Sequence, residues 1–191
     1  MSSVMTVNPE TRRRESSLSE SQESSRLAEQ PLVSICISAY NVEQYFPATL
    51  ASVLNQTYAN IEVIILDNGS TDGTAEVIGS LSDPRVRAVQ VMPNIGGYQG
   101  MNRAVSYARG DFIAVYHSDD IYEPTIVEKE VAYLQNHPDV GAVFTLDHYM
   151  DEDGKIFGKM TMPKLFEGRQ SLTYDDVFRY TKTRSSAVRR S

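Results

Sequence analysis

Short, continuous apolar runs rich in β-branched residues recur along residues 31–150 and constrain the fold of this chain more than any other feature. Clear examples are "PLVSICIS", "NIEVIILD" and "DFIAVYH". Because their apolar residues do not alternate with polar ones, such runs are typical of strands buried on both faces of a sheet. Two further runs, "VRAVQVM" and "VGAVFTL", also read as strands and extend the series.

Helical patterns separate these runs. After the first run, Phe46, Leu50 and Val53 recur at helical spacing. Similar patterns follow the second run, the glycine-rich stretch "NIGGYQG" and the acidic stretch "SDD". This alternation predicts an α/β fold with an open, mostly parallel sheet, flanking helices and right-handed crossovers. Further along, the Asp153-Gly154 pair lies between short strand-like segments and predicts a β-hairpin.

Residues 1–30 differ from the rest of the chain. They are rich in Ser, Glu and Arg and hold few apolar side chains. Burial of so few apolar groups cannot offset the entropy of ordering the backbone. We therefore expect a disordered tail over residues 1–30 and a single domain over residues 31–191.

Charge and composition narrow the partners and the compartment. The 191 residues carry a formal net charge of −7, whereas nucleic acids and anionic membranes are bound through clustered Lys and Arg. We therefore expect no nucleic-acid partner. No apolar stretch is long enough to span a bilayer, and the N-terminus lacks the apolar core of a secretory signal. Cys36 is the single cysteine, which excludes a disulfide framework. These features predict a cytoplasmic location, with peripheral attachment to the inner face of the membrane as an alternative.

Polar residues follow three of the predicted strands. They are Ser38, Tyr40 and Asn41 after the first strand, Asp67, Asn68 and Ser70 after the second, and Asp119 and Asp120 after the fourth. In open parallel sheets, ligands bind outside the carboxyl ends of the strands. We therefore expect these side chains to form one site that could stack a ring, accept hydrogen bonds from a ribose and hold a metal.

The usual phosphate-binding loops are missing from this site. The chain has no GxGxxG after its first strand and no GxxxxGK[ST] anywhere, so neither a dinucleotide fold nor a Walker ATPase is indicated. With few positive charges available, a diphosphate is best neutralised by a divalent cation held on carboxylates. Magnesium and manganese prefer oxygen ligands and often take only one or two of them from protein.

Two sequence blocks then resemble a known family. The stretches "VSICISAYNVEQYFPATLASVLNQTYANIEVIILDNGSTDGT" and "NIGGYQGMNRAVSYARGDFIAVYHSDDIYEP" are similar to the nucleotide-binding half of family 2 glycosyltransferases of the GT-A fold. The resemblance covers residues 31–150. It implies transfer of a sugar from a nucleoside diphosphate sugar to an acceptor hydroxyl, with inversion at the sugar. The acceptor, whether a glycan, a lipid-linked group or another hydroxyl, is not specified.

The resemblance also implies roles for single residues. It places the nucleotide-sugar-binding positions at Ser38, Tyr40, Glu43, Asp67, Asn68 and Asp119. Ser38 and Tyr40 match positions that border the nucleobase, whereas Asp67 and Asn68 match the pair that reads the base and the ribose. For Tyr40, plain packing remains an alternative. For Glu43, which matches an acid often seen in the family, a solvated or capping carboxylate fits equally well.

The acidic pair matches the DxD-type motif of the family. By that resemblance Asp119 faces the ribose or the donor sugar, and Asp120 holds the Mg²⁺ or Mn²⁺ ion that bridges the phosphates. Asp119 could instead cap the following helix. Two departures from the family pattern qualify these roles. First, many relatives have a second acid in place of Asn68, so the nucleobase that this chain prefers is left open. Second, His117 stands where many relatives have the first acid of an extended acidic block. His117 could be a metal ligand or a packed residue at the end of the strand.

The general base is the largest open question. Inversion needs a group that takes the proton from the attacking hydroxyl. In this family that group lies beyond a region that "SSAVRRS" resembles, so we expect it beyond Ser191 and assign no catalytic residue. Asp175 and Asp176 read better as helix-start acids. Three hypotheses follow: a donor-binding part with impaired transfer, an enzyme whose base comes from a partner chain, and a noncatalytic nucleotide-sugar-binding or interaction module.

Overall fold

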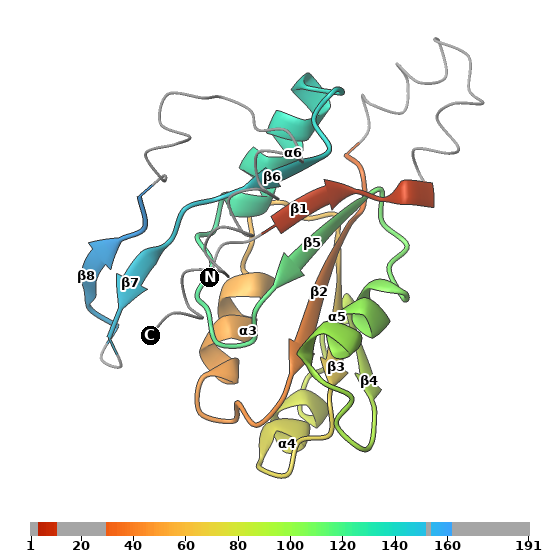
Figure 1. Ribbon diagram of the computed structural model, residues 1–191, viewed down its shortest axis with the longest axis vertical. Helices are drawn as coiled ribbons and strands as arrows, with labels where there is room; N and C mark the ends of the chain where they lie inside the picture. Colours follow the sequence, from red (N-terminus) through yellow and green to blue (C-terminus); the bar gives the residue numbers. More distant parts are fainter. Residues whose placement is uncertain (1–3, 11–29, 152–153, 162–191) are drawn as a thin grey trace, which may run out of the picture. The chain divides into compact units, whose positions relative to one another are not determined.

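The computed structural model describes residues 4–10, 30–151 and 154–161. The chain divides into two compact units, Met1–Thr145 and Leu146–Ser191. The first unit holds a sheet with helices, and the described part of the second unit is a β-hairpin (Figure 1). None of the helices in these described segments is long and apolar enough to cross a membrane.

The sheet of the first unit has six strands in the order β4-β3-β2-β5-β1-β6. They are β1 (Val4–Val7), β2 (Val33–Ala39), β3 (Ile61–Asp67), β4 (Val86–Gln90), β5 (Phe112–Tyr116) and β6 (Ala142–Phe144). Strand β2 pairs in parallel with β3 on one side and β5 on the other, and β3 pairs in parallel with β4. The predicted mostly parallel sheet with flanking helices is therefore confirmed.

Helices cover both faces of this sheet. They are α3 (Phe46–Leu54), α4 (Thr74–Gly79), α5 (Gly97–Val105) and α6 (Ile126–Asn136). Because successive side chains of a strand point to opposite faces, β2 feeds two cores. Ile35 and Ile37 join the larger cluster, to which α3, α4 and α6 contribute apolar residues. Cys36 joins the smaller cluster with Ala104 of α5. This two-sided burial explains why apolar residues stand at both odd and even positions of β2.

The N-terminal segment departs from expectation. Strand β1 lies between β5 and β6 and pairs antiparallel with both, with Met5 fully buried. Just after it, the Asn8 side chain donates a 2.7 Å hydrogen bond to the Gly110 carbonyl. The prediction of a disordered tail is therefore wrong for residues 4–7, whereas residues 11–29 lie outside the described part. The apolar stretch "VMTV" is too short to change the average composition of residues 1–30, yet two strands offer it hydrogen-bond partners.

The second unit confirms the predicted hairpin. Strands β7 (His148–Met150) and β8 (Ile156–Lys159) pair antiparallel. In the turn between them, the amide of Lys155 donates to the Asp151 carboxylate at 2.8 Å. Gly154 adopts a φ of 81°, a conformation that glycine reaches without steric cost. Asp153 itself lies outside the described residues.

Candidate functional site at the carboxyl edge of the sheet

The parallel register brings the predicted site residues to one edge of the sheet. Ala39 at the end of β2 pairs with Asp67 at the end of β3, and Ile37 of β2 pairs with Tyr116, the last residue of β5. The arrowheads of β2, β3, β4 and β5 accordingly point the same way (Figure 1). The segments that follow these strands therefore emerge side by side, as we expected for a ligand site in an open α/β sheet.

Asp67 is buried at this edge and already has partners for both carboxylate oxygens. The residue is only 3% exposed. One oxygen accepts a hydrogen bond from the Ser70 amide at 3.0 Å, and the other accepts from the Gln90 side chain at 3.0 Å. The carboxylate thus shapes the turn after β3 and ties it to the end of β4.

Asn68 is also buried, and its amide holds a loop. The residue is 2% exposed. Its side-chain oxygen accepts from the Ile95 amide at 3.1 Å, and its side-chain nitrogen donates to the Gly96 carbonyl at 3.2 Å. Both ends of the amide are thus engaged by the segment that leads into α5. A carboxylate could make the first of these bonds but could not donate the second.

Ser38 lies against Asn68 under the first turn of α5. A Cβ atom built on Gly100 would stand 2.5 Å from the Ser38 hydroxyl oxygen and 2.8 Å from the Asn68 side-chain nitrogen. A glycine is therefore required at this position because of close approach, whereas Gly96 has a φ of 88° and meets a backbone requirement. Ser38 and Asn68 thus both lie against Gly100 of α5.

The loop after β2 carries Tyr40 and Glu43, which the structure places differently from each other. Tyr40 is 47% exposed, so its ring is available to stack on a ligand. The Glu43 carboxylate accepts a 2.6 Å hydrogen bond from the Gly73 amide, at the residue just before α4. Of the two readings of Glu43, this contact favours the capping carboxylate. Because Asn41 also receives a hydrogen bond from the Thr71 amide at 2.8 Å, the loops after β2 and β3 are tied together.

The acidic pair follows β5 on a short turn. Asp119 is exposed and Asp120 is half-buried. Behind them, burial and the nearby Glu130 raise the pKa of Tyr116 well above its usual value, so its hydroxyl stays protonated. Throughout the described residues, no group of three or more His, Cys, Asp or Glu side chains gathers to hold a metal. Two neighbouring carboxylates still fit Mg²⁺ or Mn²⁺, since these ions complete their shells with phosphate and water.

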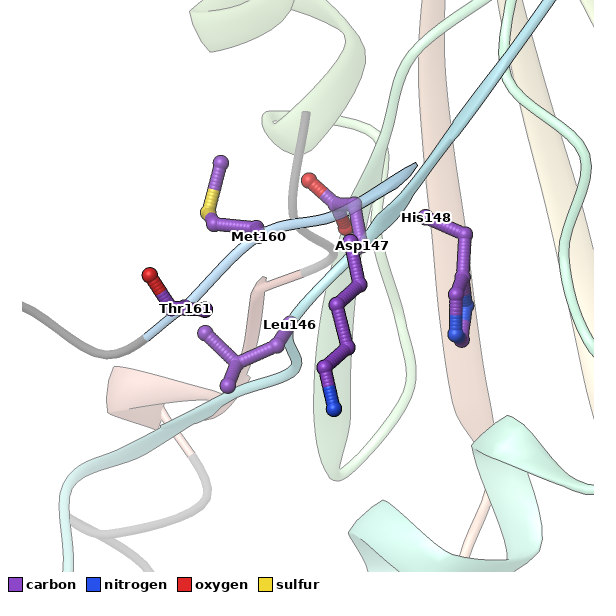
Figure 2. Close-up of a pocket in the computed structure, with 6 residues that line it drawn as sticks. Leu146, Asp147, His148, Met160 and Thr161 are labelled. Carbon is purple, nitrogen blue, oxygen red and sulfur yellow. The ribbon is translucent and has the colours of Figure 1, made fainter. Parts of the chain in front are cut away.

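A separate hollow lies on the hairpin unit. It has a volume of about 290 Å³ and is lined by Leu146, Asp147, His148, Lys159, Met160 and Thr161. Figure 2 shows these side chains projecting from the two antiparallel segments that flank the hollow. The backbone at its base is closed by a 2.6 Å hydrogen bond from the Met160 amide to the Asp147 carbonyl. None of the residues predicted for the site belongs to it.

The fold is similar to that of solved glycosyltransferases of the GT-A type. Among solved structures, that of Staphylococcus aureus TarS 1–349 in complex with UDP matches with a TM-score of 0.51 and 26% identity, over 56% of this chain and 32% of that chain. The family model for glycosyl transferase family 2 matches residues 34–190. This chain therefore belongs to glycosyltransferase family 2.

Curated relatives are longer than this chain. A hyaluronan synthase of Pasteurella multocida is 40% identical over 136 residues, which are 70% of this chain and 14% of that protein. The glucosyltransferase WfaP of Escherichia coli, named for UDP-Glc and a diphosphoundecaprenol-linked acceptor, is 31% identical over 158 residues, which are 82% of this chain and 59% of that protein. The chain thus spans less than two thirds of the length of either relative.

Several contacts of the site were not predicted from the sequence. No sequence motif identifies the loop at residues 94–96. None identifies Thr49 and Ser52 of α3 either, whose hydroxyl groups contact the turn that carries the acidic pair. Their partners lie far along the chain, as between Thr49 and Ser118, which are 69 residues apart.

Proposed function

We propose that this chain binds a nucleoside diphosphate sugar at the carboxyl edge of its sheet, for transfer of the sugar to an acceptor hydroxyl with inversion. The observation that carries the proposal is the shared edge of the sheet. Ser38 and Asp67 lie at the carboxyl ends of β2 and β3, and the acidic pair follows the neighbouring parallel strand β5. Family membership supports the reaction class. The UDP complex of TarS and the name of WfaP support a nucleoside diphosphate donor, although the base and the sugar are left open.

The acidic pair supports metal assistance. We assign Asp120 to hold Mg²⁺ or Mn²⁺ and Asp119 to face the ribose or the donor sugar. A bound divalent cation would stabilise the negative charge that develops on the leaving diphosphate. The formal net charge of −7 makes this role more important, because cationic side chains are in short supply in the chain as a whole. We assign the exposed ring of Tyr40 to border the nucleobase.

The burial pattern refines two of the expected roles. Both the oxygen and the nitrogen of the Asn68 side-chain amide are hydrogen-bonded to the loop before α5. We therefore expect Asn68 to affect base recognition by fixing the conformation of that loop. Glu43 ties the first loop to the start of α4 and acts on the donor through loop shape. No described residue is assigned as the general base that inversion needs.

The test is thermal unfolding of the purified chain with a panel of nucleoside diphosphates, with and without Mn²⁺. A ligand that binds only the folded state stabilises it by about 2.7 kcal/mol at a hundredfold excess over its dissociation constant. We expect one base to raise the melting temperature in the presence of Mn²⁺. The Asp120→Ala variant should lose the Mn²⁺-dependent part of this rise.

A matched control separates the metal site from general charge effects. Asp139 is an exposed acid just beyond α6, and Asp139→Ala should respond to nucleotide and Mn²⁺ as the parent chain does. A cooperative transition that no nucleotide shifts would refute the donor site and favour an interaction module. A response that survives Asp120→Ala unchanged would refute the metal assignment alone.

A further inference from the structure

The turn that carries the acidic pair is held at both ends. At its start, the His117 amide donates a 2.7 Å hydrogen bond to the hydroxyl of Tyr122. At its end, the Tyr122 amide donates to the Ser52 hydroxyl at 3.1 Å. Asp119 and Asp120 lie between these anchors, so their backbone has little freedom although the Asp119 side chain is exposed.

The hydroxyl of Tyr122 replaces a missing sheet partner. Strand β5 ends at Tyr116, the last residue of β5 that pairs with β2. The next amide, that of His117, is therefore beyond the ladder and needs another acceptor. Tyr122 supplies it and also donates a longer bond of 3.4 Å to the His117 carbonyl. One phenol thus contacts both polar groups of the first residue of the turn.

The ring of Tyr122 is fixed by packing. It stacks on Tyr116 with ring centroids 3.8 Å apart and an interplanar angle of 8°. Tyr122 is 5% exposed, and Tyr116 is fully buried in the core between the sheet and α3 and α6. Because the ring cannot move without opening the core, the hydroxyl holds His117 at a defined place.

Helix α3 completes the support. The buried Thr49 hydroxyl donates to the Ser118 carbonyl at 3.1 Å. Ser52 donates to the Thr49 carbonyl at 2.7 Å while it accepts from the Tyr122 amide, so it links the turn to the helix backbone. The same helix follows the loop that bears Tyr40 and Glu43, and it therefore connects the acidic turn with the first loop of the site.

We propose that Tyr122 is a positioning residue for Asp119 and Asp120: through the His117 backbone it presets the turn on which a divalent cation and a diphosphate are bound. This inference rests on the proposed donor site. A cation that takes only one or two ligands from protein gains little from each, so disorder in the turn would be costly at the moment of binding. A turn that is already ordered removes this cost.

The test compares Tyr122→Phe with Tyr58→Phe. Tyr58 is a fair control because it is 6% exposed and donates a 2.6 Å hydrogen bond to a backbone carbonyl, that of Pro31, at the other end of the sheet. Both variants keep the ring and lose one buried hydroxyl. Calorimetric titration with the best nucleoside diphosphate, with and without Mn²⁺, gives the factor by which Mn²⁺ tightens binding in each protein.

We expect this Mn²⁺ factor to fall about fivefold in Tyr122→Phe, the loss that one ordinary hydrogen bond carries, and to stay unchanged in Tyr58→Phe. In Tyr122→Phe the affinity without Mn²⁺ should fall less than the affinity with Mn²⁺, whereas a merely structural defect would lower both affinities equally and leave the Mn²⁺ factor unchanged. Amide hydrogen exchange should be faster at His117 in Tyr122→Phe only.

The outcomes separate this inference from the donor site. An unchanged Mn²⁺ factor in Tyr122→Phe, beside a clear factor in the parent chain, would overturn the positioning role and leave the proposed function intact. Unchanged exchange at His117 would overturn it as well. Absence of any Mn²⁺-dependent nucleotide binding in the parent chain would overturn the proposed function and this inference together.

Discussion

Replacement of Asn68 by Asp tests whether the buried amide holds the loop before α5. The change conserves shape and exchanges the donating nitrogen for an oxygen. The bond from the Ile95 amide at 3.1 Å can persist. The contact with the Gly96 carbonyl at 3.2 Å turns from a hydrogen bond into two oxygens facing each other. Gly96 keeps its bond from the Gly100 amide at 2.8 Å, so its carbonyl is not left without a partner.

The expected loss of stability follows from opposing effects. A lost hydrogen bond between buried groups, with a charge placed in a residue that is only 2% exposed, costs about 1–3 kcal/mol. A carboxylate near the N-terminus of α5 recovers about 0.3–1 kcal/mol through the helix dipole. We therefore expect Asn68→Asp to lower the free energy of unfolding by about 1.4 kcal/mol at pH 7, the difference between the midpoints of these two ranges.

The loss should depend on pH. Burial and the facing carbonyl disfavour the charged form, so the pKa of the new carboxyl is raised in the folded state above its unfolded value. Below the pKa that this carboxyl has in the unfolded chain, its protonated form contributes fully to the stability of the folded protein. That contribution is lost as the pH rises through the pKa in the folded protein. The protonated acid can also donate to Gly96. The stability gap between the variant and the parent chain should therefore narrow as pH falls from 7 towards about 4.

Urea unfolding at a series of pH values measures this gap. The control is Asn60→Asp, because the Asn60 side chain also donates to a backbone carbonyl, that of Gln30 at 2.7 Å, but the residue is exposed. We expect the control to change stability by less than about 0.5 kcal/mol. If Asn68→Asp were as stable as the parent chain at pH 7, or if its deficit did not shrink in acid, the role of the amide would be refuted.

Two further predictions concern the cores on either side of the sheet. Phe46 is fully buried in the first turn of α3, so Phe46→Ala should lower the free energy of unfolding, measured in urea, by about 3–5 kcal/mol. The adjacent Tyr45 is 49% exposed, so Tyr45→Ala should lower it far less. Equal losses in the two variants would contradict the burial argument. Burial, and secondly Glu62, raises the pKa of the Cys36 thiol to about 12. A thiol reagent at pH 8 should therefore label Cys36 only when urea unfolds the chain, and rapid labelling of the folded protein would show that this core opens.

Strand content and the place of the site were predictable because both are recorded in local sequence. A strand buried on both faces must be apolar at successive positions, as in "NIEVIILD", and parallel strands separated by helices end at the same edge. Polar residues at or just after the ends of such strands, as at Asp67 and Asp119, therefore marked the candidate site. The hairpin was equally local, since an Asp-Gly pair specifies a turn by itself.

The tertiary structure decided what those side chains contact. The Glu43 carboxylate accepts a hydrogen bond from Gly73, 30 residues away. The Asn68 side chain donates a hydrogen bond to Gly96, 28 residues away. Strand β1 was expected to be part of a tail and pairs with β5, with Val4 opposite Val115. Composition and spacing describe residues that are neighbours along the chain. Hydrogen bonds of about 3 Å between distant residues depend on which segments folding brings together. The sequence alone therefore determined the strands and the candidate site's position, but not these contacts.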